Sequence, residues 1–258
     1  MSAAEHRSTG RVLDILDLIV SHPEGLSLSQ IAAKLNAPKS SLFPIIQTMA
    51  TRKYLSQNRA TSTYTIGSAA FRVGMSFVNT KNAIDIIGNE MVKLVSKCQE
   101  TSFMAVLENG NAVYLLKKDS SRAVTMKASI GVSLPAYATS VGKALLLDST
   151  MEDLRRYYPN GLAALTPNTI TDMETLYNQL RQFRSDDICF ESEESNLDVR
   201  CVSTPIRRNG AIECAISIAA PVYRCSDEKI LEYRDMLLET KRTIEGILRD
   251  YHLSLNNS

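Results

Sequence analysis

The alternation of apolar and polar positions over residues 11–66 predicts three short helices followed by two strands. The first helix carries four apolar residues on one face: Val12, Ile15, Leu16 and Ile19. Ser27 and Gln30 have the spacing of a capping box, so a second helix is expected to begin directly after Ser27. The runs "YLSQN" and "STYTI" predict two strands around a polar turn. Together these elements are typical of a winged helix-turn-helix module.

The third helix is predicted from about Lys39 to Arg52, and Pro44 lies on its outer face. Its inward face has four apolar residues: Leu42, Ile45, Ile46 and Met49. A proline in the first turn costs little, whereas one in the interior costs about 3 kcal/mol. If Ser40 is the N-cap, Pro44 is the fourth helical residue; if the helix begins at Pro38, Pro44 is interior and must kink it. We expect the later start, with Ser40 as the N-cap.

The charge distribution favours nucleic acid as the partner of this module. Residues 1–80 hold eight Lys or Arg and four Asp or Glu, so their net charge is +4, whereas the net charge of the whole chain is +1. No Asp or Glu occurs from Gly25 to Ile84, as binding to a polyanion requires. Three-helix clusters also serve as protein-binding modules, but this charge makes double-stranded DNA the expected partner.

The candidate DNA contacts lie at the start of the third helix and in the wing turn. A helix of this kind fits the major groove, and a basic wing can bind the adjacent backbone. Phe43 could contact a thymine methyl group. The residues expected to contact DNA are Lys39, Ser40, Ser41, Phe43, Gln47, Arg59 and Thr61.

The remaining chain predicts an α+β module over residues 79–258, after a DNA-binding module over residues 1–78. A helix at about 80–99, expected to join the two modules, has apolar residues at helical spacing: Ile84, Ile87, Met91, Leu94 and Val95. Two Asn-Gly pairs between apolar runs predict hairpins of a central antiparallel sheet. Further helices are predicted at "TSVGKALLL", at "TMEDLRRYY", at "TDMETLYNQLRQF" with a Thr171–Glu174 capping box, and from Ser226 onward.

Two stretches of this module could carry binding chemistry. "SVGKA" lacks the glycine and the Ser or Thr of a phosphate loop, so nucleotide binding is not expected. The helix start at Thr139 and Ser140 could bind a carboxylate through free backbone N–H groups, or Thr139 and Ser140 could simply cap the helix. "ESEESNLDVR" is read as a solvated loop in preference to a lid over a pocket. Cys201 and Ser217 are by default core residues.

Composition weighs against several other classes of protein. The only histidines are His6, His22 and His252, which argues against a Ser-His-Asp hydrolase. Five widely spaced cysteines suggest neither disulfides nor a zinc site, and we expect no metal and no cofactor. The chain shows no membrane span or signal peptide, so a cytoplasmic protein is expected. The alternatives are an enzyme with Cys201 as nucleophile and a redox sensor using Cys201 or Cys214.

The sequence resembles the IclR family of bacterial transcription regulators over nearly its whole length. The resemblance rests on four stretches: "GLSLSQIAAKLNAPKSSL", "YTIGSAAFRVG", "LPAYATSVGKALLL" and "RCVSTPIRRNGAIECAISIAAP". It implies a winged helix-turn-helix domain, a linker helix and a GAF-like domain that binds a small organic acid as effector. It also implies homodimers, or dimers of dimers, on palindromic operators, in a repressor of a catabolic operon.

The resemblance also implies which residues form the effector pocket. They are Met126, Leu134, Ser140, Val141, Glu191, Val199, Cys201, Ser217 and Ala219. The chain departs from the family pattern at several positions. Ser140 and Val141 replace a Gly-Ala pair, and Ala219 replaces a serine. Phe43 and Pro44 stand where a basic or His-Arg pair is usual.

Overall fold

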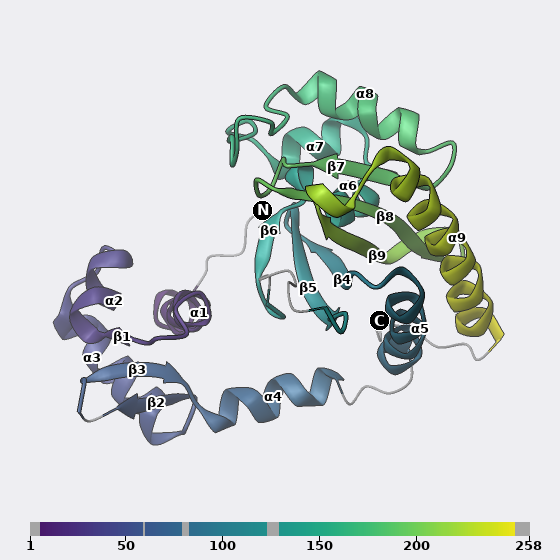
Figure 1. Cartoon of the computed structure of the whole chain (residues 1–258). Helices are drawn as coiled ribbons and strands as arrows, with labels where there is room; N and C mark the ends of the chain where they lie inside the picture. The colour runs from purple at the N-terminus through teal and green to yellow at the C-terminus, as the bar shows by residue number, and fades with distance from the viewer. Residues whose placement is uncertain (1–5, 59, 79–82, 123–128, 251–258) are drawn as a thin grey trace. The chain divides into compact units, whose positions relative to one another are not determined.

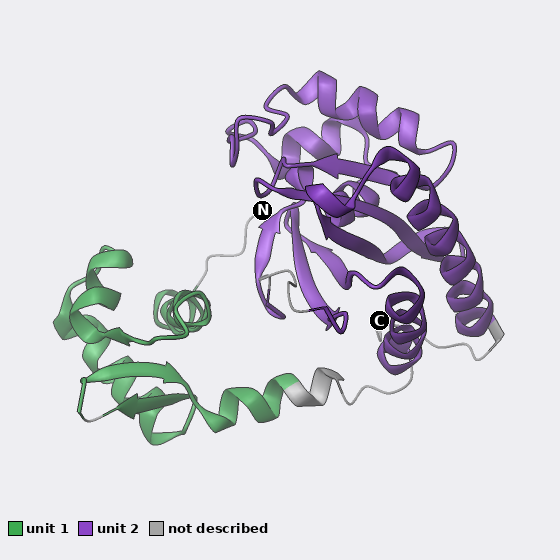
Figure 2. Ribbon diagram, in the orientation of Figure 1, with its two compact units in different colours: residues 1–81 green, residues 82–258 purple. Residues whose placement is uncertain are grey.

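A computed structural model describes residues 6–58, 60–78, 83–122 and 129–250 of this chain (Figure 1). The chain forms two compact units, residues 1–81 and 82–258 (Figure 2). The domain boundary between residues 78 and 79 expected from the sequence stays a prediction. No helix in the described ranges is long and apolar enough to cross a membrane.

The first unit is a three-helix cluster with a β-wing. Its elements are α1 (Arg7–Val20), β1 (Leu26–Ser27), α2 (Leu28–Lys34), α3 (Lys39–Thr51), β2 (Leu55–Asn58), β3 (Thr63–Ile66) and α4 (Ser68–Val78). The strands form an antiparallel sheet in the order β1-β3-β2. The expected capping box of Ser27 and Gln30 is present. The core contains the apolar faces expected from the sequence: Ile15, Ile19, Ile31, Leu42, Ile46 and Met49 are buried.

The predicted N-cap of α3 is wrong, because it is Pro38 and not Ser40, although the helix does span Lys39–Thr51, close to the predicted bounds. The Pro38 carbonyl accepts hydrogen bonds from the backbone N–H groups of Ser41, at 3.0 Å, and Leu42, at 3.3 Å. An N-cap needs a carbonyl acceptor but no N–H donor, so proline is compatible with this position. Pro44 is therefore the sixth residue of α3, inside the helix, which continues to Thr51 as one element.

The helix predicted at about residues 80–99 is confirmed, but the helix that precedes it was not predicted from the sequence. Two helices occupy this region: α4 in the first unit and α5 (Ala83–Cys98) in the second. The apolar stripe of α5 packs into the core of the second unit, where Ile87, Met91 and Leu94 are fully buried. An apolar stripe of this width is that of a helix packed on a sheet, so α5 is part of the second fold and not only a connection.

The second unit is built on a six-stranded antiparallel sheet in the order β6-β5-β4-β9-β8-β7. Its strands are β4 (Thr101–Glu108), β5 (Asn111–Lys118), β6 (Ser133–Pro135), β7 (Cys189–Ser192), β8 (Val199–Arg208) and β9 (Ala211–Pro221). Both predicted hairpins are confirmed. Their turns are Asn109-Gly110, with φ of 48° and 80°, and Asn209-Gly210, with φ of 50° and 86°. Two consecutive positive φ angles match the twist of a two-residue hairpin, and Asn-Gly tolerates them best.

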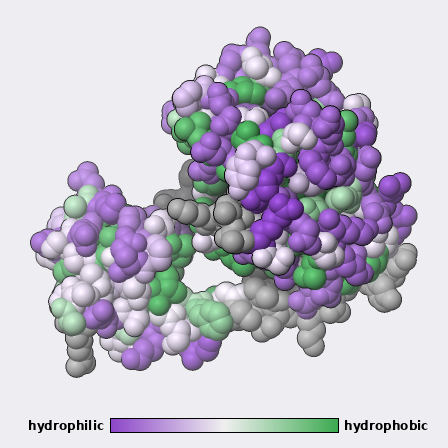
Figure 3. Space-filling model, viewed as in Figure 1, coloured by the Kyte–Doolittle hydropathy of each residue, from purple (hydrophilic) through white to green (hydrophobic). Residues whose placement is uncertain are grey.

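Helices cover both faces of this sheet. On one face, α5 and α9 (Asp227–Asp250) pack on side chains that include Met104, Ile216 and Ile218. The other face is covered by α6 (Ser140–Leu145), α7 (Met151–Tyr157) and α8 (Met173–Phe183). Alternate residues of β4 and β9 point into the hydrophobic cores on the two faces of the sheet, because successive side chains of a strand point to opposite faces. The outer surfaces of α8 and α9 are mostly hydrophilic in the view of Figure 3.

The predicted capping box of α8 is wrong in its residues. Asp172, and not Thr171, is the N-cap, and its carboxylate accepts a hydrogen bond from the Thr175 N–H at 2.7 Å. The side chains of both Thr171 and Asp172 can cap a helix, and the N-cap is whichever of them directly precedes the first helical residue. The carboxylate at the helix start also has a lowered pKa because of the hydrogen bonds from the side chain and backbone of Thr175.

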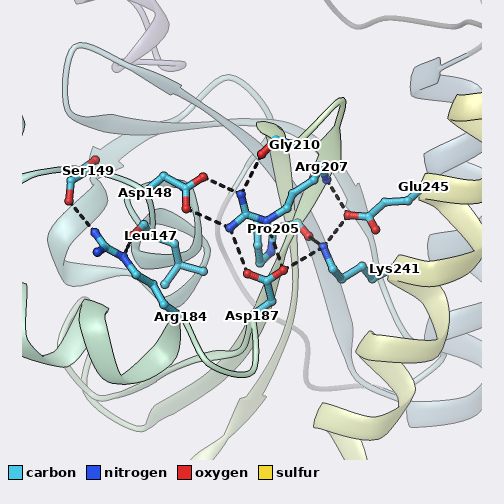
Figure 4. A network of polar contacts seen from close by, with 10 residues as sticks. All are labelled: Leu147, Asp148, Ser149, Arg184, Asp187, Pro205, Arg207, Gly210, Lys241 and Glu245. Carbon is cyan, nitrogen blue, oxygen red and sulfur yellow. Dashed lines mark hydrogen bonds and ion pairs between the residues drawn. The ribbon is translucent and has the colours of Figure 1, made fainter.

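A network of polar contacts joins the two helix layers at one end of the sheet (Figure 4). Arg207 of β8 binds both Asp148, which follows α6, and Asp187, which precedes β7, with Nη2 at 3.0 Å from each carboxylate. Lys241 of α9 lies 3.3 Å from Asp187 and donates a hydrogen bond to the Pro205 carbonyl. Glu245 of α9 accepts a hydrogen bond from the Arg207 backbone N–H at 2.7 Å.

This network should make a small, pH-dependent contribution to stability. Burial alone would raise the pKa of Asp187, but the hydrogen bonds and charges of Arg207 and Lys241 outweigh it and lower the pKa below the usual 3.8. A carboxyl group with a lowered pKa stabilises the fold above its unfolded-state pKa, and that contribution is lost as the pH falls below about 4. Asp187→Asn should therefore reduce the free energy of unfolding at neutral pH by about 1 kcal/mol or less, because the pair is partly solvated.

Urea unfolding of the wild type and of Asp187→Asn at several pH values would measure this effect. Asp235→Asn is a suitable control, because Asp235 is three-quarters exposed and its ion pair with the neighbouring Arg234 is long, at 3.5 Å. The difference between wild type and Asp187→Asn should disappear in acid. A difference of the same size at every pH would contradict the prediction.

Candidate functional site

A cavity of about 580 Å³ lies in the second unit, on the face of the sheet that α6 covers. Eight of the nine residues implied by the family resemblance line this one cavity: Leu134, Ser140, Val141, Glu191, Val199, Cys201, Ser217 and Ala219. The ninth, Met126, lies outside the described residues. Strands β4 and β5 add two aromatic side chains, Phe103 and Tyr114.

The register of the strands explains why residues distant in the sequence line the same wall of the cavity. Cys201 of β8 lies opposite Glu191 of β7 on one side and opposite Ala219 of β9 on the other. Ser217 of β9 lies opposite Phe103 of β4. Directly opposite residues of antiparallel strands point to the same face of the sheet. A single row across three strands therefore presents a carboxyl, a thiol and a methyl group to the cavity.

The start of α6 forms another part of the wall. Thr139 is the N-cap, and its hydroxyl accepts a hydrogen bond from the Gly142 N–H at 3.0 Å. A Cβ atom at Gly142 would lie 2.3 Å from the Ala136 carbonyl oxygen, a contact too short for any side chain. The glycine of "SVGKA" thus permits a close backbone approach. Helix capping by Thr139, one of the two alternatives left open by the sequence, is present.

The acidic stretch is not simply a solvated loop, and that prediction is wrong for its two best-buried carboxylates. Glu191 is 4% exposed and Glu194 is 6% exposed. The four residues after Glu194, Ser195–Asp198, line the cavity. The stretch therefore forms part of the cavity wall, although Asn196, Leu197 and Asp198 are also exposed to solvent.

Lys143 explains how Glu194 can be buried. The Lys143 side chain is fully buried on α6 and forms a short ion pair with a carboxylate oxygen of Glu194. The hydroxyl group of Thr169 donates a hydrogen bond to the Glu194 carbonyl at 2.6 Å, and that of Thr166 donates to the Glu193 carbonyl at 2.6 Å. Buried charges require partners of this kind. These contacts fix the loop of the acidic stretch against α6, through Lys143, and against the segment that precedes α8, through Thr166 and Thr169.

The predicted DNA contacts lie on the first unit. Lys39, Ser40 and Phe43 are exposed on α3, with Phe43 48% exposed, and Gln47 is half-buried. Thr61 is exposed in the wing turn, where its hydroxyl group bonds that of Thr63 at 2.8 Å. Arg59 lies outside the described residues. The α3 positions share an exposed surface at the start of the helix, as groove binding requires.

Ser41 differs from its neighbours because its hydroxyl group is engaged within the protein. It donates to the Pro38 carbonyl at 2.8 Å and accepts a hydrogen bond from the guanidinium of Arg11 at 2.7 Å. Arg11 lies on α1, and sequence reasoning did not select it. Its position beside the start of α3 adds a positive charge to the candidate DNA-binding surface.

Family models match both units of the chain. The model described as "Bacterial transcriptional regulator IclR C-terminal" covers residues 75–245, and the one described as "IclR helix-turn-helix domain" covers residues 8–59. The chain belongs to the IclR family of bacterial transcriptional regulators. Its winged helix-turn-helix domain and its antiparallel sheet domain are those of the family, and the expected resemblance is confirmed.

Individual IclR proteins agree with this assignment. The HTH-type transcriptional repressor AllR of Salmonella typhimurium is 27% identical over 240 residues, which cover 92% of this chain and 88% of that protein. An IclR regulator from Alicyclobacillus acidocaldarius has the same fold, with a TM-score of 0.84, 19% identity and coverage of 94% and 98% of the two chains. An IclR homologue from Microbacterium hydrocarbonoxydans, complexed with 4-hydroxybenzoate, superposes with a TM-score of 0.78, 20% identity and coverage of 94% and 99%.

The electrostatics of the cavity argue against the alternative in which Cys201 is the nucleophile of an enzyme. Burial raises the pKa of the Cys201 thiol, and the neighbouring Glu191 raises it further. A nucleophilic cysteine requires the opposite shift. Burial also raises the pKa of the Tyr114 hydroxyl and raises that of Glu191 to about 7, the latter against the opposing effect of the Glu194 N–H group. The groups that face the cavity are therefore mostly uncharged hydrogen-bonding groups.

Sequence reasoning missed several residues of this IclR cavity. Phe103 and Tyr114 carry no local signal that separates them from ordinary strand residues. The loop residues Ser195–Asp198 were considered only as part of a possible lid. Lys143 did offer a signal, because a lysine within the apolar run "VGKALLL" must be buried and needs an acidic partner. Which acid serves as that partner could not be read from the sequence.

Proposed function

We propose that this IclR protein is an effector-responsive repressor of a catabolic operon, and that a small organic acid binding in the cavity changes its operator affinity. The observation that carries the proposal is the convergence of eight implied effector residues on one cavity. A 580 Å³ cavity with apolar walls and a few polar groups has the size and makeup of a metabolite site. The 4-hydroxybenzoate complex of the Microbacterium homologue supports an acid as the ligand class.

The DNA half of the proposal rests on the surface of α3 and the wing. Lys39, Ser40, Phe43 and Gln47 would contact DNA from α3, with Ser41 held by Arg11, and Arg59 and Thr61 would contact it from the wing. Homodimers or dimers of dimers would place two such helices on a palindromic operator, because half-site symmetry mirrors protein symmetry. Effector binding would shift operator affinity only by its differential affinity for the DNA-bound and free states.

Ser140→Val should separate the two activities. Ser140 lines the cavity at the start of α6 and belongs to the unit that lacks the DNA-binding surface. Valine removes its hydroxyl group while keeping a small side chain on a buried position. We expect at least a tenfold weaker effector response and an operator affinity within about twofold of wild type, because one hydrogen bond to a charged ligand contributes roughly 1.5–3 kcal/mol. Operator binding titrated with candidate acids would measure both quantities.

Lys39→Ala is the matched variant for the DNA-binding unit. Loss of one phosphate contact should weaken binding to all DNA sequences and reduce the slope of log affinity against log salt concentration by about one. The effector response should stay unchanged. Equal loss of operator affinity and effector response in Ser140→Val would contradict the proposed division of labour. Binding that does not distinguish the native operator from a scrambled duplex would overturn the regulatory proposal itself.

A further inference from the structure

Glu191 is a buried acid without a cation of its own. It is 4% exposed, and it lines the cavity from β7. One of its oxygens accepts a hydrogen bond from the Glu194 N–H at 2.9 Å, and the other has a 3.5 Å contact with the Ser195 hydroxyl. The Cys201 thiol is a further hydrogen-bond partner, but it is uncharged. An ionised carboxylate at such a depth normally requires a positive partner or several strong donors.

The groups around Glu191 come from every element packed against it. Lys143 and Ser140 approach from α6, Cys201 from β8 and Tyr114 from β5, and the acidic loop adds Glu194 and Ser195. Asp198 lines the cavity from an exposed loop position. Lys143 is the one cation of this set, and its ammonium group forms its ion pair with Glu194. Within the described residues, no Lys, Arg or His lines the cavity.

An anionic ligand therefore faces a difficulty in this cavity. The hydroxyl groups of Ser140, Ser217 and Tyr114 can donate hydrogen bonds to it, but an ionised Glu191 would repel it. A protonated Glu191 would instead donate a hydrogen bond to the ligand, as neutral carboxylic acids do in other apolar sites. With Lys143 balanced by Glu194, the addition of one proton at Glu191 leaves this cluster neutral and able to accept one negative charge.

We propose that the cavity binds a carboxylate together with one proton, which Glu191 holds and donates in a hydrogen bond to the ligand. The proposal rests on the proposed function, since it presupposes an acid effector, and it specifies how that acid is recognised without a cationic side chain. The only bond change in this step is proton transfer: an ionised Glu191 forms its O–H bond with a proton released by a solvent or buffer acid, and a protonated Glu191 needs no transfer. The pKa of about 7 that burial confers on Glu191 places this exchange near neutral pH.

The sign of the pH dependence follows from this proton. Below about pH 7 Glu191 is already protonated, so the affinity for the ligand should not change with pH. Above it each pH unit should weaken binding about tenfold, because one proton must be taken up. Glu191→Gln keeps an N–H donor in place of the acid O–H and cannot ionise, so its affinity should not vary with pH. Gln can still accept the hydrogen bond from the Glu194 N–H.

The test uses the full chain and 4-hydroxybenzoate, lactate and succinate as probes, with 4-hydroxybenzamide as the uncharged analogue. Calorimetric titrations at about pH 6 to pH 8.5, in buffers of different ionisation enthalpy, give the affinity and the number of protons bound. Infrared difference spectra of the ligand-free wild type and Glu191→Gln detect the protonated carboxyl group independently of any ligand. Glu108→Gln, an exposed carboxyl at the end of β4, is the matched control, and thermal unfolding verifies that each variant is folded.

The expected result is proton uptake approaching one at alkaline pH in the wild type and in Glu108→Gln, with none in Glu191→Gln. Acid binding that is independent of pH, or no Glu191 carboxyl signal at about pH 6, would overturn this inference and leave the proposed function intact. Tighter binding of the amide than of its acid at every pH would also overturn it. Failure of every acid to bind would overturn the inference and the acid-effector part of the proposed function together.

Discussion

Lys143→Met should lower the free energy of unfolding of the second unit by about 3–5 kcal/mol, because it leaves the Glu194 carboxylate buried and without its positive partner. Methionine occupies nearly the same volume as the aliphatic part of lysine, so little of the loss would come from a cavity. Glu194 cannot easily turn to solvent, because the Thr166 and Thr169 hydroxyl groups bind the backbone carbonyls of its loop. One of its carboxylate oxygens already lacks a hydrogen-bond partner among the residues that the structure describes.

Chemical unfolding monitored by circular dichroism would measure this effect. Lys93→Met is the matched control, because Lys93 pairs with Glu90 at 2.7 Å on the surface of α5 with a side chain 68% exposed, and such pairs contribute at most about 1 kcal/mol. Lys143→Met combined with Glu194→Gln should recover much of the lost stability, since it removes both charges. If Lys143→Met lost no more stability than Lys93→Met, the ion pair would not be the contact that holds the loop.

Pro44→Ala should stabilise the DNA-binding unit by about 2–3 kcal/mol, because proline in a helix interior costs about 3 kcal/mol relative to alanine. Pro44 is the sixth residue of α3, so it cannot donate the hydrogen bond that the Ser40 carbonyl would accept in a regular helix. Its exposed position means that the substitution leaves no buried cavity. The alanine amide would restore the missing donor.

Hydrogen exchange of the α3 amides in the full chain would report this change locally, which suits a protein of two units. Thr51→Ala, at the exposed last residue of α3, is the control for helix propensity without a change of backbone donor, and it should add only a few tenths of a kcal/mol. Protection of α3 that rises no further in Pro44→Ala than in Thr51→Ala would show that the surrounding structure already compensates for the missing hydrogen bond.

The sequence alone predicted those features that local patterns encode. Asn-Gly turns fixed both hairpins because few residues accept two consecutive positive φ angles. Helical spacing identified the buried faces of α1, α3 and α5 because one face of each must leave water. The family resemblance supplied eight residues that line one cavity, although their binding of an effector is a proposal.

Competing local choices were settled only by tertiary structure. Pro38 and Ser40 were both possible starts of α3, and the N-cap of α8 is Asp172, where the sequence pattern had indicated Thr171. Capping ability alone does not select the N-cap, since Pro38 has no side-chain cap bond and yet precedes α3. The point at which the chain enters a helix depends on packing of the rest of the fold. The apolar stripe of α5 was likewise predicted without the surface on which it packs, because the partner of a stripe is not encoded in the stripe itself.

The chemistry of the cavity depends most on tertiary structure. Lys143 and Glu194 are 51 residues apart, and their pairing converts an apparently solvated acidic stretch into a cavity wall. Glu191 acquires its raised pKa from burial between α6 and the acidic loop. The sequence by itself determined the family, the helical faces and the hairpins, because those depend on neighbours along the chain. Burial and charge pairing depend on neighbours in space, so only the tertiary structure decided them.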